Sequence, residues 1–283
     1  MLKKTVLIFI LIAVFYNMAV LYVDKNIAKK GVDFKYDSCH KVWASRGLYE
    51  THAEQNSLVS LQRAFERGFN GVEIDFYYDV VMHKFILSHN KPKKDKNGKL
   101  LYTLKDGKLL TLQEVFENVG EGHYFWLDYK NLDRLSKQET TQALQRLEEI
   151  SKIHHVKERL YIEGSTPFLL SRYTKEGFFT LFAMQPLKES SPFSSISSNI
   201  IKIVYYFFDF SAVAMPYGHL DNPKYSKTTE ENLEKIPTFL FHVPDDDALL
   251  HRLVKLQDVK VMLVGRDKSI NRSNITICED KEK

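Results

Sequence analysis

Short apolar runs rich in strand-forming residues alternate along this chain with segments of helical periodicity. Several of these runs are continuous rather than alternating, which is typical of strands buried on both faces of a sheet. Such alternation predicts βα units and a parallel sheet. The expected strands are Lys41–Ser45, Gly71–Tyr77, Phe85–His89, Tyr124–Tyr129, Arg159–Ile162, Phe178–Phe182, Ala212–Met215, Thr238–Val243 and Lys260–Val264. The expected helices are Leu58–Arg67, Leu112–Val119, Lys137–Ile153, Pro167–Tyr173, Glu230–Lys235 and Asp246–Val254.

Nine expected strands are one more than an eight-stranded barrel needs. We therefore expect Phe85–His89 to fold back beside Gly71–Tyr77 as a hairpin arm. The fold class that follows is α/β, a (β/α)8 TIM barrel over residues 39–283, and 283 residues suit one such domain. Gln185–Asn199 is rich in Ser, Pro and Lys and is expected to be a long loop. The aromatic run Ile200–Phe210 is expected to be either a buried helix or a helix that dips into a bilayer.

The amino terminus carries an apolar run from Thr5 to Val23 behind Lys3 and Lys4. As a helix this run would span about 28 Å, close to the thickness of the hydrocarbon core of a membrane. The two lysines favour a cytoplasmic amino end. Because no small-x-small cleavage site follows the run, an uncleaved signal anchor over residues 1–23 is favoured over a cleaved signal peptide. We expect 24–38 to be a spacer, and the following domain to lie on the periplasmic or extracellular side.

Charge and cysteine content narrow the classes of partner. The formal net charge is +4, with Lys and Arg spread through the chain. This balance fits an anionic phosphate substrate, an anionic lipid surface or an ordinary solvated surface, and no nucleic-acid partner is expected.

The two cysteines, Cys39 and Cys278, do not have zinc spacing. In a closed barrel they would lie near the same end, so a disulfide is expected there, with two unpaired thiols as the alternative.

The sharpest local motif is Gly71-Val72-Glu73-Ile74-Asp75. Glu73 and Asp75 are two residues apart on an expected strand, so both carboxylates point to one side. Their repulsion would be resolved by a divalent cation with oxygen ligands. Taken alone, the pair could equally be ordinary charges on a solvent-facing strand. The apolar flanks on both faces favour a buried strand, where unpaired carboxylates are costly.

A second polar set follows on two later strands. Asp128 and Lys130 share a face of their expected strand, which suits a site that binds both a metal and a phosphate oxygen. His89 ends an apolar strand and is a candidate general acid or base. An ordinary surface ion pair and a structural histidine are the alternatives.

Five motifs occur in an order that resembles the glycerophosphodiester phosphodiesterase family, over roughly residues 40–130. They are Ala44-Ser45-Arg46-Gly47 in the place of the family's His-Arg-Gly, Glu54-Gln55-Asn56-Ser57, Gly71-Val72-Glu73-Ile74-Asp75, His89-Asn90 and Asp128-Tyr129-Lys130. The last form is also similar to the venom phospholipase D barrels.

The resemblance implies a metal-dependent phosphodiester hydrolase that acts on glycerophosphodiesters or lysophospholipid-type headgroups. It implies that Ca²⁺ or Mg²⁺ is held by Glu73, Asp75 and Asp128. It implies that the phosphate and substrate are bound by Arg46, Asn56 and Lys130, and that His89 is one member of an acid/base pair.

The sequence departs from the family's pattern at Ser45, which stands in place of the first catalytic histidine, and at Asn90 after His89. Three explanations stay open for Ser45. His52, in the following loop, could replace the missing histidine, whereas His40 would lie roughly 16 Å away along the strand. The enzyme could work with His89 alone. The barrel could also be a catalytically impaired module that binds lipid or phosphate. Apart from these explanations for Ser45, a different metal hydrolase on the same barrel is a further alternative for the function.

Overall fold

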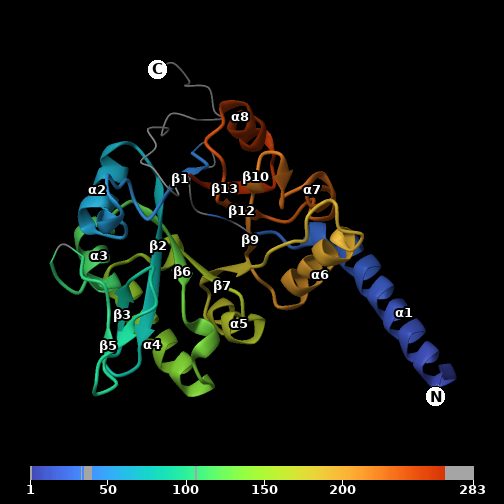
Figure 1. The fold of residues 1–283 in the computed structure, drawn as a ribbon, viewed down its shortest axis with the longest axis horizontal. Helices are drawn as coiled ribbons and strands as arrows, with labels where there is room; N and C mark the ends of the chain where they lie inside the picture. Colours follow the sequence, from blue (N-terminus) through green and yellow to red (C-terminus); the bar gives the residue numbers. More distant parts are fainter. Residues whose placement is uncertain (1, 33, 35–39, 106, 265–283) are drawn as a thin grey trace.

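The computed structural model describes residues 2–32, 34, 40–105 and 107–264 (Figure 1). A long amino-terminal helix, α1 (Leu2–Asn26), projects from the body and ends in a short 3-10 helix at Ile27–Lys29. The helical stretch Lys4–Lys29 is long and apolar enough to cross a membrane, and little of it is buried. Cys39 and Cys278 lie outside the described residues, so their expected disulfide stays a prediction.

Eight parallel strands close into a barrel. Closure is made by β1, which pairs with β2 through Ala44 and Val72 and with β13 through Val42 and Met262. Around the barrel the strands are β1 (Val42–Ser45), β2 (Gly71–Asp79), β6 (Tyr124–Tyr129), β7 (Leu160–Gly164), β8 (Phe179–Ala183), β9 (Ala212–Pro216), β12 (Thr238–Phe241) and β13 (Val259–Val264). The predicted (β/α)8 barrel is confirmed.

The predicted hairpin arm is also confirmed. Strand β3 (Lys84–Leu87) runs antiparallel to β2, with Phe76 opposite Leu87. The turn between them begins at Asp79, whose Oδ1 accepts the backbone N–H groups of Val81 and Met82 at 2.9 Å. Two small hairpins were not predicted: β4 (Lys93–Lys94) with β5 (Leu100–Leu101), and β10 (Gly218–His219) with β11 (Asn222–Pro223).

Helices cover the outside of the barrel (Figure 1). They are α2 (Leu58–Glu66), α3 (Leu112–Val119), α4 (Lys137–Ile153), α5 (Pro167–Lys175), α6 (Ser194–Phe207), α7 (Lys227–Asn232) and α8 (Asp247–Lys255). Helices α3 and α4 have their expected bounds, and α3 begins with a capping box in which Thr111 and Glu114 each bind the other's backbone N–H.

Two predictions for helices were wrong in part. Helix α6 begins at Ser194, inside the segment 185–199 that was expected to be a loop. Its first turns are held by α7, since Asn232 Nδ2 donates to Ser198 Oγ at 2.9 Å and to Ser195 Oγ at 3.2 Å. Helix α7 starts at Lys227 rather than Glu230, because the Ser226 side chain caps it by accepting the Thr229 N–H.

The core has two layers. The outer layer lies between the strands and the helices and receives alternate residues of β2, such as Val72, Ile74 and Phe76. The inner layer fills the barrel with aromatic and aliphatic side chains, including Trp43 and Trp126, both fully buried. Gly71 is required here, because a Cβ on it would lie 2.4 Å from the Trp43 ring.

The amino end of the barrel is closed by an aromatic side chain from the connecting segment after α1. Phe34 packs 5.7 to 6.0 Å, centroid to centroid, from the rings of Tyr161, Phe179 and Phe239. Apolar rings fill this end of the barrel, so the polar side chains of the interior lie at the opposite end, where the strands have their carboxyl ends.

Candidate active site

A cavity of about 590 Å³ opens at the carboxyl ends of the strands. This is the end at which TIM barrels carry their active sites. It is lined by Ser45, Arg46, His52, Ala53, Gln55, Glu73, His89, Asn90, Thr103, Lys105, Asp128, Lys130, Glu163, Phe241, His242 and Leu263.

Three carboxylates meet at this cavity: Glu73 and Asp128 line it, and the fully buried Asp75 lies directly behind them. Glu73 and Asp75 share one face of β2, and Asp128 on β6 is in register with Asp75. One oxygen of each carboxylate lies within 4.8 Å of the other two. Glu73 and Asp75 are buried, with 4 % and 0 % of their surface exposed. The structure therefore brings together the three residues proposed from the sequence as metal ligands.

Two cations lie against the same cluster. The Lys130 ammonium is 2.5 Å from Asp75 Oδ1 and also pairs with Asp128. The Arg46 guanidinium Nε lies 3.0 Å from Asp75 Oδ2, on the other side of that carboxylate. Asp75 is thus clamped between the two cations expected to bind phosphate.

Arg46 is held by an unusual loop. Arg46 and Asn56 both have φ of +58°, and the Asn56 N–H donates to the Arg46 carbonyl at 3.1 Å. Between them, Gly47 has φ of +76°, and a Cβ on it would meet the backbone of Ser60 at 2.6 Å. The left-handed turn directs the guanidinium back over β2.

Asn56 is fully buried and is bound to Asp75 on both sides of its amide. Its Nδ2 donates to Asp75 Oδ2 at 2.8 Å, and its Oδ1 accepts the Asp75 backbone N–H at 3.0 Å. Both groups of the amide therefore position Asp75, and Asn56 is not itself among the residues that line the cavity.

Ser45 is bound to a carboxylate of the cluster. Its hydroxyl donates to Glu73 Oε2 at 3.0 Å, and the same oxygen accepts the Arg46 backbone N–H at 3.1 Å. Ser45 thus orients Glu73 in this structure.

Burial and mutual repulsion set the charge states of the carboxylates. Burial, reinforced by Asp75, raises the pKa of Glu73 well above its usual range, and burial also raises the pKa of Asp128. Burial of Asp75 acts in the same direction, but Lys130 and Arg46 outweigh it and hold the pKa of Asp75 low. Three carboxylates this close are costly to ionise together, and a divalent cation that prefers oxygen ligands, such as Ca²⁺ or Mg²⁺, would offset that cost, so these side chains fit a metal.

Two of the predicted histidines line the cavity. Burial lowers the pKa of His89, which favours its neutral form. His52 Nδ1 accepts a hydrogen bond from Gln55 Nε2 at 2.9 Å, and Gln55 Oε1 accepts one from Arg46 at 3.1 Å. His40 is described in the structure but is not among the lining residues.

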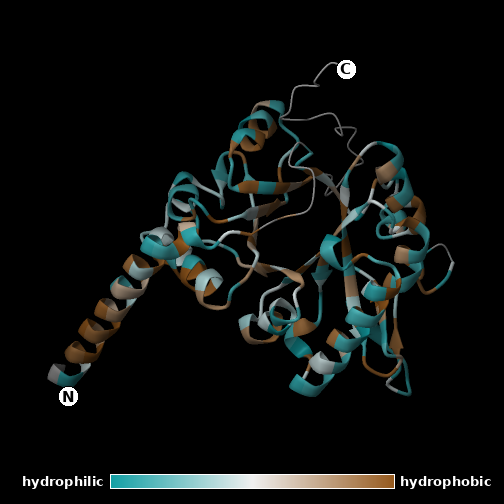
Figure 2. Ribbon diagram, turned by 180° about the vertical axis from the view of Figure 1, so that it is seen from behind, coloured by the Kyte–Doolittle hydropathy of each residue, from teal (hydrophilic) through white to brown (hydrophobic). Residues whose placement is uncertain are grey.

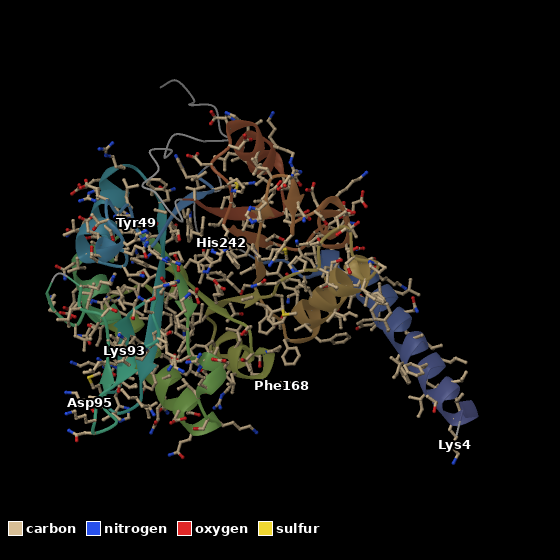
Figure 3. All side chains as sticks on the ribbon, in the orientation of Figure 1. Lys4, Tyr49, Lys93, Asp95, Phe168 and His242 are labelled. Atoms are coloured by element: carbon tan, nitrogen blue, oxygen red, sulfur yellow. The ribbon has the colours of Figure 1, made fainter. Side chains whose placement is uncertain are left out.

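Sequence reasoning missed several lining residues, and two of them, Glu163 and His242, carry titratable side chains at the ends of strands. Glu163 on β7 is in register with Asp128, and its Oε2 accepts a hydrogen bond from the Trp126 indole N–H at 2.5 Å. Burial, with the charge of Asp128, raises the pKa of Glu163 to about 8. His242 follows β12, with φ of +51° (Figure 3). Both residues sit where an expected strand ends, and that position is the signal by which they could have been found.

Comparison with solved structures shows what this fold is similar to. A glycerophosphodiester phosphodiesterase from Parabacteroides distasonis superposes with a TM-score of 0.56 and 15 % identity, over 79 % of this chain and 91 % of that one. One from Agrobacterium tumefaciens gives 0.53 and 12 %, over 82 % and 98 %. An Oleispira antarctica phosphodiesterase in complex with the product sn-glycerol-3-phosphate gives 0.57 and 14 %, over 80 % and 92 %.

This chain shares the (β/α)8 barrel fold of these solved phosphodiesterases. The likeness is one of structure: no protein-family model matches the sequence, and no curated protein matches it either. In this barrel the carboxylate cluster and both cations come from β1, β2 and β6 or the segments that directly follow them. The resemblance noticed in the motifs of residues 40–130 thus agrees with the three-dimensional fold.

Proposed function

We propose that this protein is a metal-dependent phosphodiester hydrolase that acts on glycerophosphodiesters or lysophospholipid-type headgroups. The observation that carries the proposal is the cluster of Glu73, Asp75 and Asp128 with Arg46 and Lys130. All of these residues except the buried Asp75 line one cavity. The shared fold supports it, since one structural neighbour holds sn-glycerol-3-phosphate as its product.

A Ca²⁺ or Mg²⁺ ion held by Glu73, Asp75 and Asp128 would polarise a phosphoryl oxygen and offset the charge that grows there during attack. Arg46 and Lys130 lie beside the same cluster and would bind the remaining phosphate oxygens. Asn56 would contribute to substrate binding indirectly, by fixing the Asp75 carboxylate against which Arg46 rests.

The reaction needs one proton acceptor and one proton donor. Water or a neighbouring hydroxyl of the substrate attacks phosphorus, the bond from phosphorus to the leaving oxygen breaks, and that oxygen takes a proton. His89 is suited to accept the first proton, because burial favours its neutral form. Ser45 cannot take the other role while its hydroxyl is bound to Glu73. His52 is therefore proposed as the second member of the pair.

The two further cavity histidines can be separated by mutation. We expect His52→Ala to lower kcat by about 100-fold, the usual size of a general acid or base contribution. His242→Ala is the matched comparison, because His242 lines the same cavity. Unchanged turnover in His52→Ala with a large loss in His242→Ala would reassign the second proton carrier to His242.

A second candidate function is a catalytically impaired barrel that binds lipid or phosphate. The specific observation in its favour is Ser45, whose side chain offers no proton carrier in the place where the resembled family has a histidine.

The deciding experiment is a hydrolysis assay that follows release of glycerol 3-phosphate or an alcohol headgroup with and without a chelator. We expect activity that chelation abolishes and that Ca²⁺ or Mg²⁺ restores. Glu73→Ala should lower kcat/KM by about 100-fold or more, since it removes a ligand of the metal, whereas the exposed Glu117→Ala should leave it unchanged. Metal-dependent binding of phosphodiesters without turnover would favour the binding module.

We also propose that α1 is an uncleaved signal anchor, which would place the barrel on the extracytoplasmic side of a membrane. Its support is the length and apolar character of Lys4–Lys29 and the two lysines at its amino end. The mass of the mature chain tests this, because a chain beginning near residues 24–30 would show that the segment is removed.

A further inference from the structure

Helix α6 presents apolar side chains on two faces. The inner face is packed on the barrel and includes Ile201 and Tyr205, both fully buried. The outer face carries Ile196, Ile200 and Phe207, which are 42 %, 44 % and 58 % exposed. Their spacing of four and seven residues places them on one stripe of the helix. A helix that only supported the barrel would carry polar residues on this outer stripe.

The stripe extends beyond α6 at both ends. Phe193, directly before the helix, is 60 % exposed. On α5, Phe168 is 76 % exposed and packs edge-to-face on Phe208, with centroids 4.9 Å apart (Figure 3). We call the set Phe168, Phe193, Ile196, Ile200 and Phe207 the α6 patch. A grouped apolar surface of this kind marks a contact site.

The end of α1 is fixed to the same helix. The Tyr22 ring stacks on Phe207 with centroids 6.1 Å apart, and it meets Tyr206 edge-to-face at 5.9 Å. Next to them, Asp24 forms an ion pair with Lys202 at 2.5 Å, and Val23 is fully buried. Since these contacts join the last turns of α1 to α6, the level of α1 in a membrane sets the level of α6.

If α1 crosses a membrane, its carboxyl-terminal end lies at the membrane surface, and the α6 patch beside that end would face the bilayer. The remainder of α1 is exposed and apolar, and Figure 2 shows it as a hydrophobic rod standing away from the body. Tyr22 near its end has the position of an interfacial aromatic residue. Lys25 and Lys29 follow directly, where they can meet anionic headgroups. Figure 1 shows α6 lying across the end of α1, as a helix in the membrane plane would.

We propose that α6 is an interfacial helix whose patch inserts into the surface of the phospholipid bilayer beside α1. The inference rests on the membrane anchor given under the proposed function and adds a second point of contact. Helix α6 connects β8 to β9, which lie opposite β1 and β2 around the barrel. The bilayer contact therefore holds the wall of the barrel farthest from Glu73 and Asp75.

The test uses tryptophan fluorescence of the full chain in phosphatidylcholine vesicles with brominated or ordinary acyl chains. The two native tryptophans, Trp43 and Trp126, are fully buried inside the barrel and give a background shielded from lipid. A new tryptophan at Ile200→Trp should be quenched about twofold by brominated chains, as expected for a side chain in the acyl boundary. Val81→Trp is the matched control, since Val81 is 90 % exposed on the β2–β3 hairpin.

Phe9→Trp reports on α1 itself and separates failure of the patch from failure of the anchor. Quenching of both Phe9→Trp and Ile200→Trp, but not Val81→Trp, supports the proposal. Quenching of Phe9→Trp alone overturns the α6 contact and leaves the anchor standing; quenching of neither overturns both. An unquenched but blue-shifted Ile200→Trp in a chain of dimer mass would assign the patch to a second copy and also overturn the proposal. Circular dichroism checks that each variant is folded, and none of these readouts depends on hydrolysis.

Discussion

Ser45 stands at the position where the resembled family has a catalytic histidine, but its side chain makes a different kind of contact. Its hydroxyl lies 3.0 Å from Glu73 Oε2, so it supports a proposed metal ligand rather than carrying a proton. The neighbouring Arg46 backbone N–H binds the same oxygen, which leaves the carboxylate held by two donors from β1 and its turn. In the proposed mechanism, acid–base chemistry would therefore come from other residues that line the cavity, His89 and His52.

Ser45→Ala should weaken binding of the metal, because the carboxylate loses one of the two donors that orient it. Loss of such a supporting contact lowers metal affinity by about 10- to 100-fold. Titration calorimetry with Ca²⁺ and Mg²⁺ measures this directly, with the exposed Ser190→Ala as the control. Equal affinity in both variants would show that Ser45 does not position Glu73.

At the level of secondary structure elements, α2 meets the segment before β6 through a stacked ring pair. His123 lies parallel to Phe65, with ring centroids 3.7 Å apart. Burial, with the nearby Arg159, lowers the pKa of His123. The unfolded chain therefore binds a proton at this site at a higher pH than the folded chain does.

The folded state should accordingly lose stability as pH falls below about 6.5, the ordinary histidine value. The contribution of His123 is complete above that pH and is lost on the way down to its lowered folded-state pKa. Urea unfolding at pH 7.5 and 5.5 tests this. His123→Phe keeps a ring against Phe65 and should show a smaller loss between the two pH values than the wild type. An identical loss in both would exclude His123 as its source.

The elements show what periodicity can and cannot predict. Helices α3 and α4 could be placed because their apolar spacing and caps agree. The start of α6 could not, because its serine-rich first turns have polar composition and are held by tertiary contacts, in which Asn232 of α7 donates to Ser195 and Ser198. The two short hairpins, β4–β5 and β10–β11, leave no periodic signal, because two residues per strand are too few for an alternation.

The residues of the candidate site also fall into a group that could be predicted from the sequence and a group that was missed. Glu73 and Asp75 could be paired from sequence because their spacing puts both on one face of one strand. Glu163 and His242 were missed, because their only sequence signal is a single polar residue at a strand end, with no charged residue two positions away to strengthen it. Only closure of the barrel brings β7 and β12 to the cavity that β2 lines.

For the whole molecule, the carboxylate cluster should couple metal binding to stability. Three buried or half-buried acids lie within 4.8 Å of one another, and a bound cation would relieve their repulsion in the folded state alone. Saturating Ca²⁺ or Mg²⁺ at about 100 times Kd should add about 2.7 kcal/mol to the free energy of unfolding. Thermal unfolding with metal and with chelator measures the difference. Glu73→Ala should abolish it, and a metal-independent Tm would argue against a site at these residues.

Phe34 and the aromatic rings around it determine how small molecules move through the barrel. They stop the amino end, and fully buried Trp43 and Trp126 occupy the interior above them, so the described part of the barrel is a cup rather than a tube. Whatever reaches Glu73 has to depart through the rim by which it came. Two products formed there would leave through the same opening, so the product nearer the opening would have to dissociate first.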